Sequence, residues 1–213
     1  MSARLAGPVS QVSQLTTKTK ESAVDKTWEH RMQEVLDRQA ISDCLLRYTR
    51  GVDRVDAELI RSAFHPDALD FHSATQAGTV ESFLSYWLPL QATRETAQHH
   101  VTNCSVDVDA GGDTAHAETY FFCIIKESGL STVRMSGGRY VDRLEKRNDE
   151  WRIALRLVLS EWKADADASS MAEMPGRALA MSRRDRNDPV YQRPLMRPQV
   201  PVVGVAAGEE AQP

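Results

Sequence analysis

Cysteine is scarce in this chain of 213 residues, and its spacing excludes two common kinds of scaffold. The three cysteines, Cys44, Cys104 and Cys123, are odd in number and include no C-x-x-C pair. We therefore expect neither a disulfide framework nor a structural zinc site. Such cysteine usage is typical of the reducing cytoplasm, where we expect the protein to work.

Long apolar runs and excess positive charge are also missing. No stretch approaches the roughly 18–20 apolar residues that a bilayer-spanning helix needs. The 26 Lys and Arg residues are outnumbered by 30 Asp and Glu residues, which gives a formal charge of −4. This balance offers no support for binding to nucleic acid or to an anionic membrane. There is no glycine-rich phosphate loop, and no H-x-H or H-x-x-x-H pair that would indicate a metal site.

Composition divides the chain into three zones. Residues 1–27 are rich in Ser, Thr, Gln and Lys, lack the apolar stretch of a secretory signal, and are expected to form a flexible leader. Residues 28–163 carry the regular apolar pattern of a folded domain. Residues 164–213 form a Pro- and Arg-rich tail. This tail closes over the domain, crosses to a neighbouring molecule, or remains a solvated strap.

The first part of the patterned zone has helical spacing. Apolar residues recur at helical intervals over 32–48, and Gly51 is expected to stop that helix. A second helix is expected over 57–64 and a third over 79–90, with Thr79 as its N-cap.

The apolar period changes to that of a strand after Gln98. Strands are expected over 67–72, 101–109, 114–126, 133–145 and 151–162. Helices followed by long antiparallel strands predict an α+β domain. A sheet of that length must curl around the helices, and the enclosed cavity is the place to seek function.

Two adjacent histidines are the first candidates for chemistry. His99 and His100 lie on one strand, so their side chains point to opposite faces and only one enters the cavity. An inward histidine is either a satisfied core residue or an acid–base group, and the second role needs a carboxylate partner. Asp53 is either that partner or a cap for the following helix. Tyr48, on the apolar side of the first helix, is either a core aromatic or a cavity-facing acid.

The segment Ile41–Asp56 resembles the opening helix of the SnoaL-like group of the nuclear transport factor 2-like superfamily. Three later segments agree, since His99–Asn103, Gly138–Leu144 and Trp151–Arg156 resemble its first long, central and closing strands. The resemblance covers about residues 28–163. It implies a cone-shaped α+β barrel in which a curled antiparallel sheet wraps around N-terminal helices.

The resemblance also implies roles for individual residues. In the dehydrochlorinase of this superfamily and its relatives, an Asp after the first helix and a His opening the long strand form a dyad, and these positions match Asp53 and His99. The bile acid dehydratase has a Tyr at the position of Tyr48, where the dehydrochlorinase has a Lys. This favours a reaction at an oxygenated carbon over loss of halide. The implied roles are His99 as base, Asp53 as its orienting group and Tyr48 as acid or oxyanion donor. The residues expected to bind substrate are Arg139, Arg156, Asn103 and Trp87.

The implied activity is that of a cofactor-independent lyase, which removes water or another small group from a hydrophobic cyclic or aromatic molecule. Neither a metal nor a redox cofactor is expected. An isomerase on the same dyad is the nearest alternative. A non-catalytic β subunit of a ring-hydroxylating dioxygenase and a ligand-binding protein are alternatives of another class. A homo-oligomer, either dimer or trimer, is expected because outer sheet faces in this superfamily commonly pack together.

Overall fold

The computed structural model describes residues 15–170 and 182–196. The elements in these ranges are α1 (Leu15–Asp53), α2 (Ala57–Ser62), β1 (Phe64–Ser73), β2 (Gln76–Thr79), α3 (Val80–Gln91), β3 (Arg94–Val108), β4 (Thr114–Glu127), β5 (Thr132–Arg147), β6 (Glu150–Asp167) and the 3-10 helix η1 (Pro189–Tyr191). The strands in these ranges form one six-stranded sheet in the order β2-β1-β6-β5-β4-β3.

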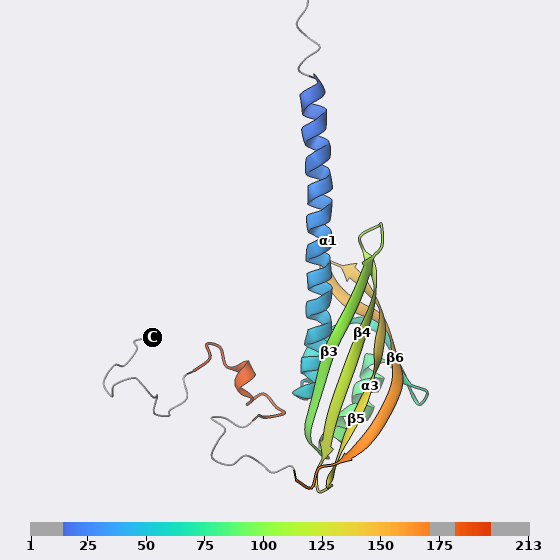
Figure 1. Ribbon diagram of the computed structural model, residues 1–213, viewed down its shortest axis with the longest axis vertical. Helices are drawn as coiled ribbons and strands as arrows, with labels where there is room; N and C mark the ends of the chain where they lie inside the picture. Colours follow the sequence, from blue (N-terminus) through green and yellow to red (C-terminus); the bar gives the residue numbers. More distant parts are fainter. Residues whose placement is uncertain (1–14, 171–181, 197–213) are drawn as a thin grey trace, which may run out of the picture.

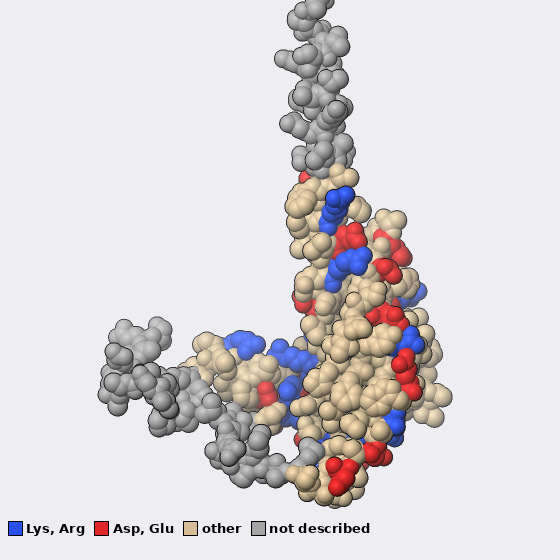
Figure 2. Space-filling model, in the orientation of Figure 1, with Lys and Arg blue, Asp and Glu red and all other residues tan. Residues whose placement is uncertain are grey.

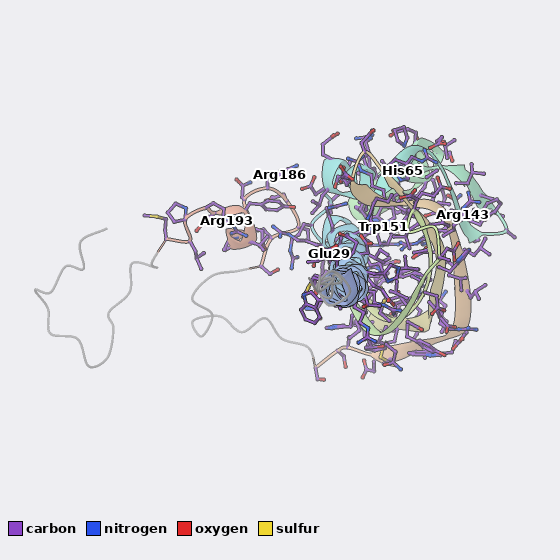
Figure 3. All side chains as sticks on the ribbon, turned by 90° about the horizontal axis from the view of Figure 1, so that it is seen from above. Glu29, His65, Arg143, Trp151, Arg186 and Arg193 are labelled. Carbon is purple, nitrogen blue, oxygen red and sulfur yellow. The ribbon has the colours of Figure 1, made fainter. Side chains whose placement is uncertain are left out.

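The sheet curls around the helices, which confirms the predicted cone-shaped α+β fold (Figure 1). Seen from above, α1 lies in the open side of the curve, and Trp151 lies between this helix and the strands (Figure 3). The sheet does not close, because β2 and β3 remain its two edges. It is also mixed instead of wholly antiparallel, since β1 pairs in parallel with β6. These two strands are far apart in the chain, so no hairpin fixes their relative direction.

Helix α1 begins much earlier than the sequence analysis expected. It starts at Leu15, so residues 15–27 are helical where a flexible leader was expected over 1–27. Residues 1–14 of that leader lie outside the described residues. The physical reason is that no proline or glycine interrupts the sequence between Leu15 and Arg50, so a helix propagates through the polar segment. No helix in the described ranges combines the length and apolar character needed to cross a membrane.

Gly51 does not stop α1, which continues to Asp53. A Cβ atom at position 51 would lie 2.8 Å from Cγ1 of Ile60 in α2. Because glycine has no Cβ atom, it allows α2 to pack closely against α1 at this position. The chain turns after Asp53 through Val55, whose φ is 53°, and the Asp56 side chain caps α2 by accepting a hydrogen bond from the Leu59 amide at 3.1 Å.

The long strands extend beyond their predicted ends, and their curvature has a local cause. β3 begins at Arg94 and β6 ends at Asp167, so the sheet is deeper than expected. A bulge interrupts the pairing of β5 with β6 between Gly137 and Gly138. A Cβ atom at Gly138 would overlap the carbonyl oxygen of Leu159, so glycine is required where the two backbones approach.

A fully buried ion pair lies inside the cone. Arg156 on β6 donates from Nε and Nη2 to the two carboxylate oxygens of Asp142 on β5, at 2.8 and 2.7 Å. Its guanidinium lies 4.2 Å from the ring centroids of both Tyr48 and Tyr140. Burial lowers the pKa of Arg156, but the Asp142 carboxylate and the two tyrosines raise it by a larger amount. The pKa of Arg156 is therefore raised overall. The guanidinium therefore keeps its charge and holds Tyr48 from α1 against the sheet.

Removing one partner of this pair tests its structural role. Asp142→Ala leaves a buried, uncompensated guanidinium, and we expect it to lower the free energy of unfolding by about 3–5 kcal/mol in urea titrations. The control is Asp165→Ala, which removes an exposed partner of Arg134 and is expected to cost no more than about 1 kcal/mol. Equal losses in the two variants would contradict the assigned role.

Candidate active site

Asp53 and His99 meet where the end of α1 packs against β3. One carboxylate oxygen of Asp53 accepts a hydrogen bond from Nδ1 of the His99 ring at 2.7 Å, and the other accepts the His99 backbone N–H at 2.9 Å. A carboxylate that binds both groups of one residue fixes the orientation of the ring. Nε2 of His99 is then left as the nitrogen that can exchange a proton with a ligand.

The alternation of β3 decides which histidine faces inward. His99 is largely enclosed, with 13% of its side chain exposed, whereas His100 is exposed and stacks on Phe122 with 6.3 Å between ring centroids. This agrees with the prediction that only one of the two enters the cavity. The placement brings His99 and Asp53 together, as the sequence analysis expected.

The pKa of His99 reflects opposing effects. Burial lowers it, but the hydrogen bond with Asp53 and the neighbouring Cys123 sulfur raise it more, so the pKa is raised to about 9. The imidazole is therefore a stronger base than ordinary histidine, and its protonated form is stabilised by the carboxylate. A group with this combination, placed in a cavity, is suited to proton transfer.

The cavity next to His99 has a volume of about 240 Å³. Its walls come from α1, α3 and the inner face of the sheet, and most are apolar or aromatic. The apolar and aromatic lining consists of Tyr48, Val52, Phe83, Tyr86, Trp87, Leu90, Phe121, Ile125, Tyr140 and Val158. The polar lining, apart from His99, consists of His72, Gln76, Arg94, Cys123, Ser136 and Ser160. Such a site suits a small hydrophobic ligand with few polar groups.

Tyr48 lines this cavity from α1. Its ring meets those of Phe64 and Tyr140 edge-on, with centroids 5.6 and 5.8 Å away. Burial raises the pKa of Tyr48 well above its ordinary value, although Arg156 opposes the rise. The phenol therefore stays protonated near neutral pH, which is the state in which it donates a hydrogen bond.

The four residues expected to bind substrate do not share one place. Trp87 on α3 lines the cavity, beside Phe83. Arg156 is inside the cone but lies behind Tyr48 and is not part of the lining. Arg139 is on the opposite face of β5, where it forms ion pairs with Glu118 and Glu161. Its position outside the cavity corrects the expectation of a substrate contact.

Asn103 is also outside the cavity, and a bulge explains why. The pairing of β3 with β4 shifts between Val101 and Cys104, so one extra residue stands on β3. His99 and Val101 face inward before the bulge, and Val106 is buried after it. Asn103 stands within the bulge and is exposed. The expectation from the family resemblance that Asn103 binds substrate is therefore corrected, because the bulge turns its side chain away from the cavity.

Three cavity residues with a guanidinium, thiol or imidazole group were not identified from the sequence. Arg94 begins β3 and brings to the cavity a guanidinium group, where Arg139 and Arg156 had been expected to bind substrate. Burial lowers the pKa of Arg94. Cys123 stands opposite His99 in the pairing of β3 with β4. His72 on β1 lies in the lining, with its Nδ1 3.3 Å from an oxygen of Asp70. The sequence signal for Asp70 and His72 was their D-x-H spacing on an expected strand, which places both side chains on one face of the sheet.

The described part of the tail packs against the domain beside the dyad. Arg184 donates to the backbone carbonyl of Asp53 at 3.3 Å and to Oε1 of Gln91 at 2.7 Å. Arg186 and Tyr191 both donate to the Asp56 carboxylate, at 2.8 Å each. Figure 2 shows Lys and Arg side chains gathered where this segment meets the body of the molecule. Residues 182–196 thus brace the turn that carries Asp53; the rest of the tail after residue 170 lies outside the described residues.

The pKa of His99 tests the geometry of the dyad. In Asp53→Asn the carboxylate charge is lost while the shape is kept, so we expect the pKa of His99 to fall from about 9 towards its ordinary value of 6.5. A raised pKa in the folded state stabilises the protein below pH 6.5, and this stabilisation is lost as the pH rises through 9. NMR titration of the imidazole measures the shift. The control is Asp43→Asn, an exposed change on the same helix, which should leave the pKa of His99 raised. An unaltered His99 pKa in Asp53→Asn would contradict the assignment of Asp53 as the partner of His99.

The described residues contain no cluster of three or more His, Cys, Asp or Glu side chains arranged to hold a metal ion.

Solved structures with the same fold include a candidate scytalone dehydratase from Novosphingobium aromaticivorans, with a TM-score of 0.59 and 16% identity over 70% of this chain and 99% of that chain. A type 2 hexachlorocyclohexane dehydrochlorinase has a TM-score of 0.61 and 17% identity over 68% of this chain and 99% of that chain. A candidate aromatic ring hydroxylase from Novosphingobium aromaticivorans has a TM-score of 0.55 and 22% identity over 62% of this chain and 94% of that chain.

At these identities the structural likeness establishes the fold alone. No curated protein matches the sequence. The family model of the SnoaL-like domain matches residues 33–156, which is more than half of the chain. The matched range includes the second half of α1, both residues of the dyad and most of the sheet. The chain belongs to the SnoaL-like family.

Proposed function

We propose that this protein is a cofactor-independent lyase that removes water or another small leaving group from a hydrophobic cyclic or aromatic molecule. The observation that carries the proposal is the Asp53–His99 pair at an apolar cavity, with 2.7 Å between the carboxylate and Nδ1. The names of two structural neighbours, a dehydratase and a dehydrochlorinase, describe eliminations and agree with it.

The proposed reaction begins with proton transfer to His99. Its Nε2 accepts a proton from a carbon next to a carbonyl-type group, and the electrons of that C–H bond form the new double bond. The leaving group departs with its own bonding pair. Asp53 stabilises the imidazolium that forms, while the neutral phenol of Tyr48 donates a hydrogen bond to the developing oxyanion. Arg94 adds a positive charge to the cavity wall.

The aromatic lining supports the proposed substrate class. Trp87 and Phe83 stack with 5.9 Å between centroids on one wall, and Phe121 stacks on Tyr140 at 4.6 Å on another. Flat faces of this kind hold a planar ring and exclude water, which strengthens every charge interaction in the cavity.

Replacing His99 tests the proposal directly. We expect His99→Ala to lower turnover by at least about a hundredfold with the fold intact, because the base is lost. The purified protein is incubated with pools of hydroxylated steroids, polyketide-like phenols and lignin-derived diaryl diols, and mass spectrometry records loss of water or formaldehyde. The matched control is His100→Ala, which removes the neighbouring, outward-facing imidazole and should retain activity.

The pH dependence gives a second test on the same substrate. The neutral imidazole is the active base, so kcat/KM should rise with pH up to about 9 and then level. A rate that falls steadily as the pH rises towards 9 would show that neutral His99 is not the base. Equal turnover by wild type and His99→Ala would contradict the mechanism. Conversion without a mass change would favour an isomerase, and the absence of any conversion would favour a subunit or binding protein.

We further propose a homo-oligomer built on the outer face of the sheet. Large apolar side chains are exposed there on β1 and β6, which is unusual for the surface of a monomer. They are Leu69, Phe71, Leu157, Leu159 and Trp162. We expect sedimentation equilibrium to give the mass of a dimer or trimer, and Leu157→Glu with Leu159→Glu to shift it to that of a monomer. A monomeric wild type would contradict the proposal.

A further inference from the structure

A second histidine–carboxylate pair borders the same cavity. His72 on β1 lines it and stacks on Phe83, with 4.9 Å between ring centroids. Nδ1 of His72 lies 3.3 Å from Oδ1 of Asp70. The two residues are separated by one position on a strand, so both side chains are on its inner face. The sequence and the proposed function assign no role to this pair.

The carboxylate of Asp70 is fully buried, so a nearby positive charge or hydrogen-bond donor is needed to stabilise it. Its side chain is 0% exposed, and its second oxygen, Oδ2, has no hydrogen-bond partner in the described part of the chain. Across the pairing of β1 with β6 it stands next to Arg156, whose Nε and Nη2 bind Asp142 and whose Nη1 has no hydrogen-bond partner among the described residues. A buried carboxylate is costly unless it is paired. The His72 ring both contacts Asp70 and lines the cavity.

The two histidines approach the cavity from different walls. β1 and β3 are separated in the sheet by β6, β5 and β4, and the sheet curls. His72 and His99 therefore stand on opposite sides of the space that a ligand would occupy. Each has Nδ1 directed at a carboxylate, at 3.3 and 2.7 Å, so Nε2 is the nitrogen of each ring that does not face its carboxylate.

We propose that His72 is a second catalytic residue, the general acid that protonates the leaving group, with Asp70 as its positioning residue. The inference rests on the proposed lyase function and narrows its substrate class to molecules that lose a hydroxyl or alkoxyl group. His99 takes the proton from carbon, the C–H electrons form the double bond, and the C–O bond breaks. The imidazolium of His72 gives its Nε2 proton to the departing oxygen, which leaves as water or an alcohol. Proton exchange with solvent restores both rings.

The reason for this restriction lies in the leaving groups. A hydroxyl group leaves poorly unless it is protonated, whereas chloride leaves as a stable anion without a proton. An acid on the wall opposite the base therefore assists the loss of water much more than the loss of chloride. Two probes separate these cases, β-hydroxyindanone and β-chloroindanone, because both give the same indenone when they eliminate.

The test compares the indenone formation rate of His72→Gln with that of wild type on both probes, after subtraction of the uncatalysed rate. We expect His72→Gln to slow loss of water about a hundredfold and loss of chloride by less than about tenfold. Asp70→Asn should change the same ratio in the same direction with little effect on KM. The matched control is His116→Gln, which disrupts an exposed His–Asp contact of 3.8 Å with Asp109 on another hairpin and should leave both rates near those of wild type.

The outcomes separate this inference from the proposed function. Elimination of chloride that depends on His99, without elimination of water by wild type, would support the lyase and overturn the role of His72. Equal slowing of both probes by His72→Gln would also overturn it, since a structural defect has that effect. Failure of wild type to eliminate either group would count against the lyase for this ring system and would overturn both.

Discussion

The guanidinium of Arg156 is the charge around which the interior of the cone is arranged. A buried cation requires compensation from neighbouring protein groups. Asp142 gives it two hydrogen bonds, and Tyr48 and Tyr140 offer their ring faces. Since Tyr48 belongs to α1 and the other three belong to the sheet, this one charge also fixes the depth at which the helix lies in the curve.

That depth decides whether the dyad exists. Asp53 is five residues after Tyr48, and the helix carries it to the level of His99 on β3. The two hydrogen bonds between them use one carboxylate, so a small displacement of α1 would break both. The site therefore depends on a rigid helix, not on a flexible loop. This arrangement satisfies the requirement that catalytic groups be held within a fraction of an ångström.

The sequence predicted those features that depend on local period. The alternation of His99 and His100 and the cap at Thr79 follow from neighbouring residues alone. The features that were missed depend on partners far away in the chain. Asn103 was displaced by a bulge whose position is set by β4, and Arg139 could be assigned to a face only once Tyr140 was known to pack against Arg156. Cys123, Arg94 and His72 enter the cavity through the register and curl of the sheet, which no local pattern encodes.

The electrostatics of the dyad extend to the C-terminal segment. Arg184 binds the backbone carbonyl of Asp53 and also that of Arg94. Burial lowers the pKa of Arg184, and the nearby Asp53 carboxylate opposes this fall. Burial also lowers the pKa of Arg94. A residue 131 positions after Asp53 thus holds the backbone that carries this carboxylate, so the geometry of the site belongs to the whole fold and not to two residues.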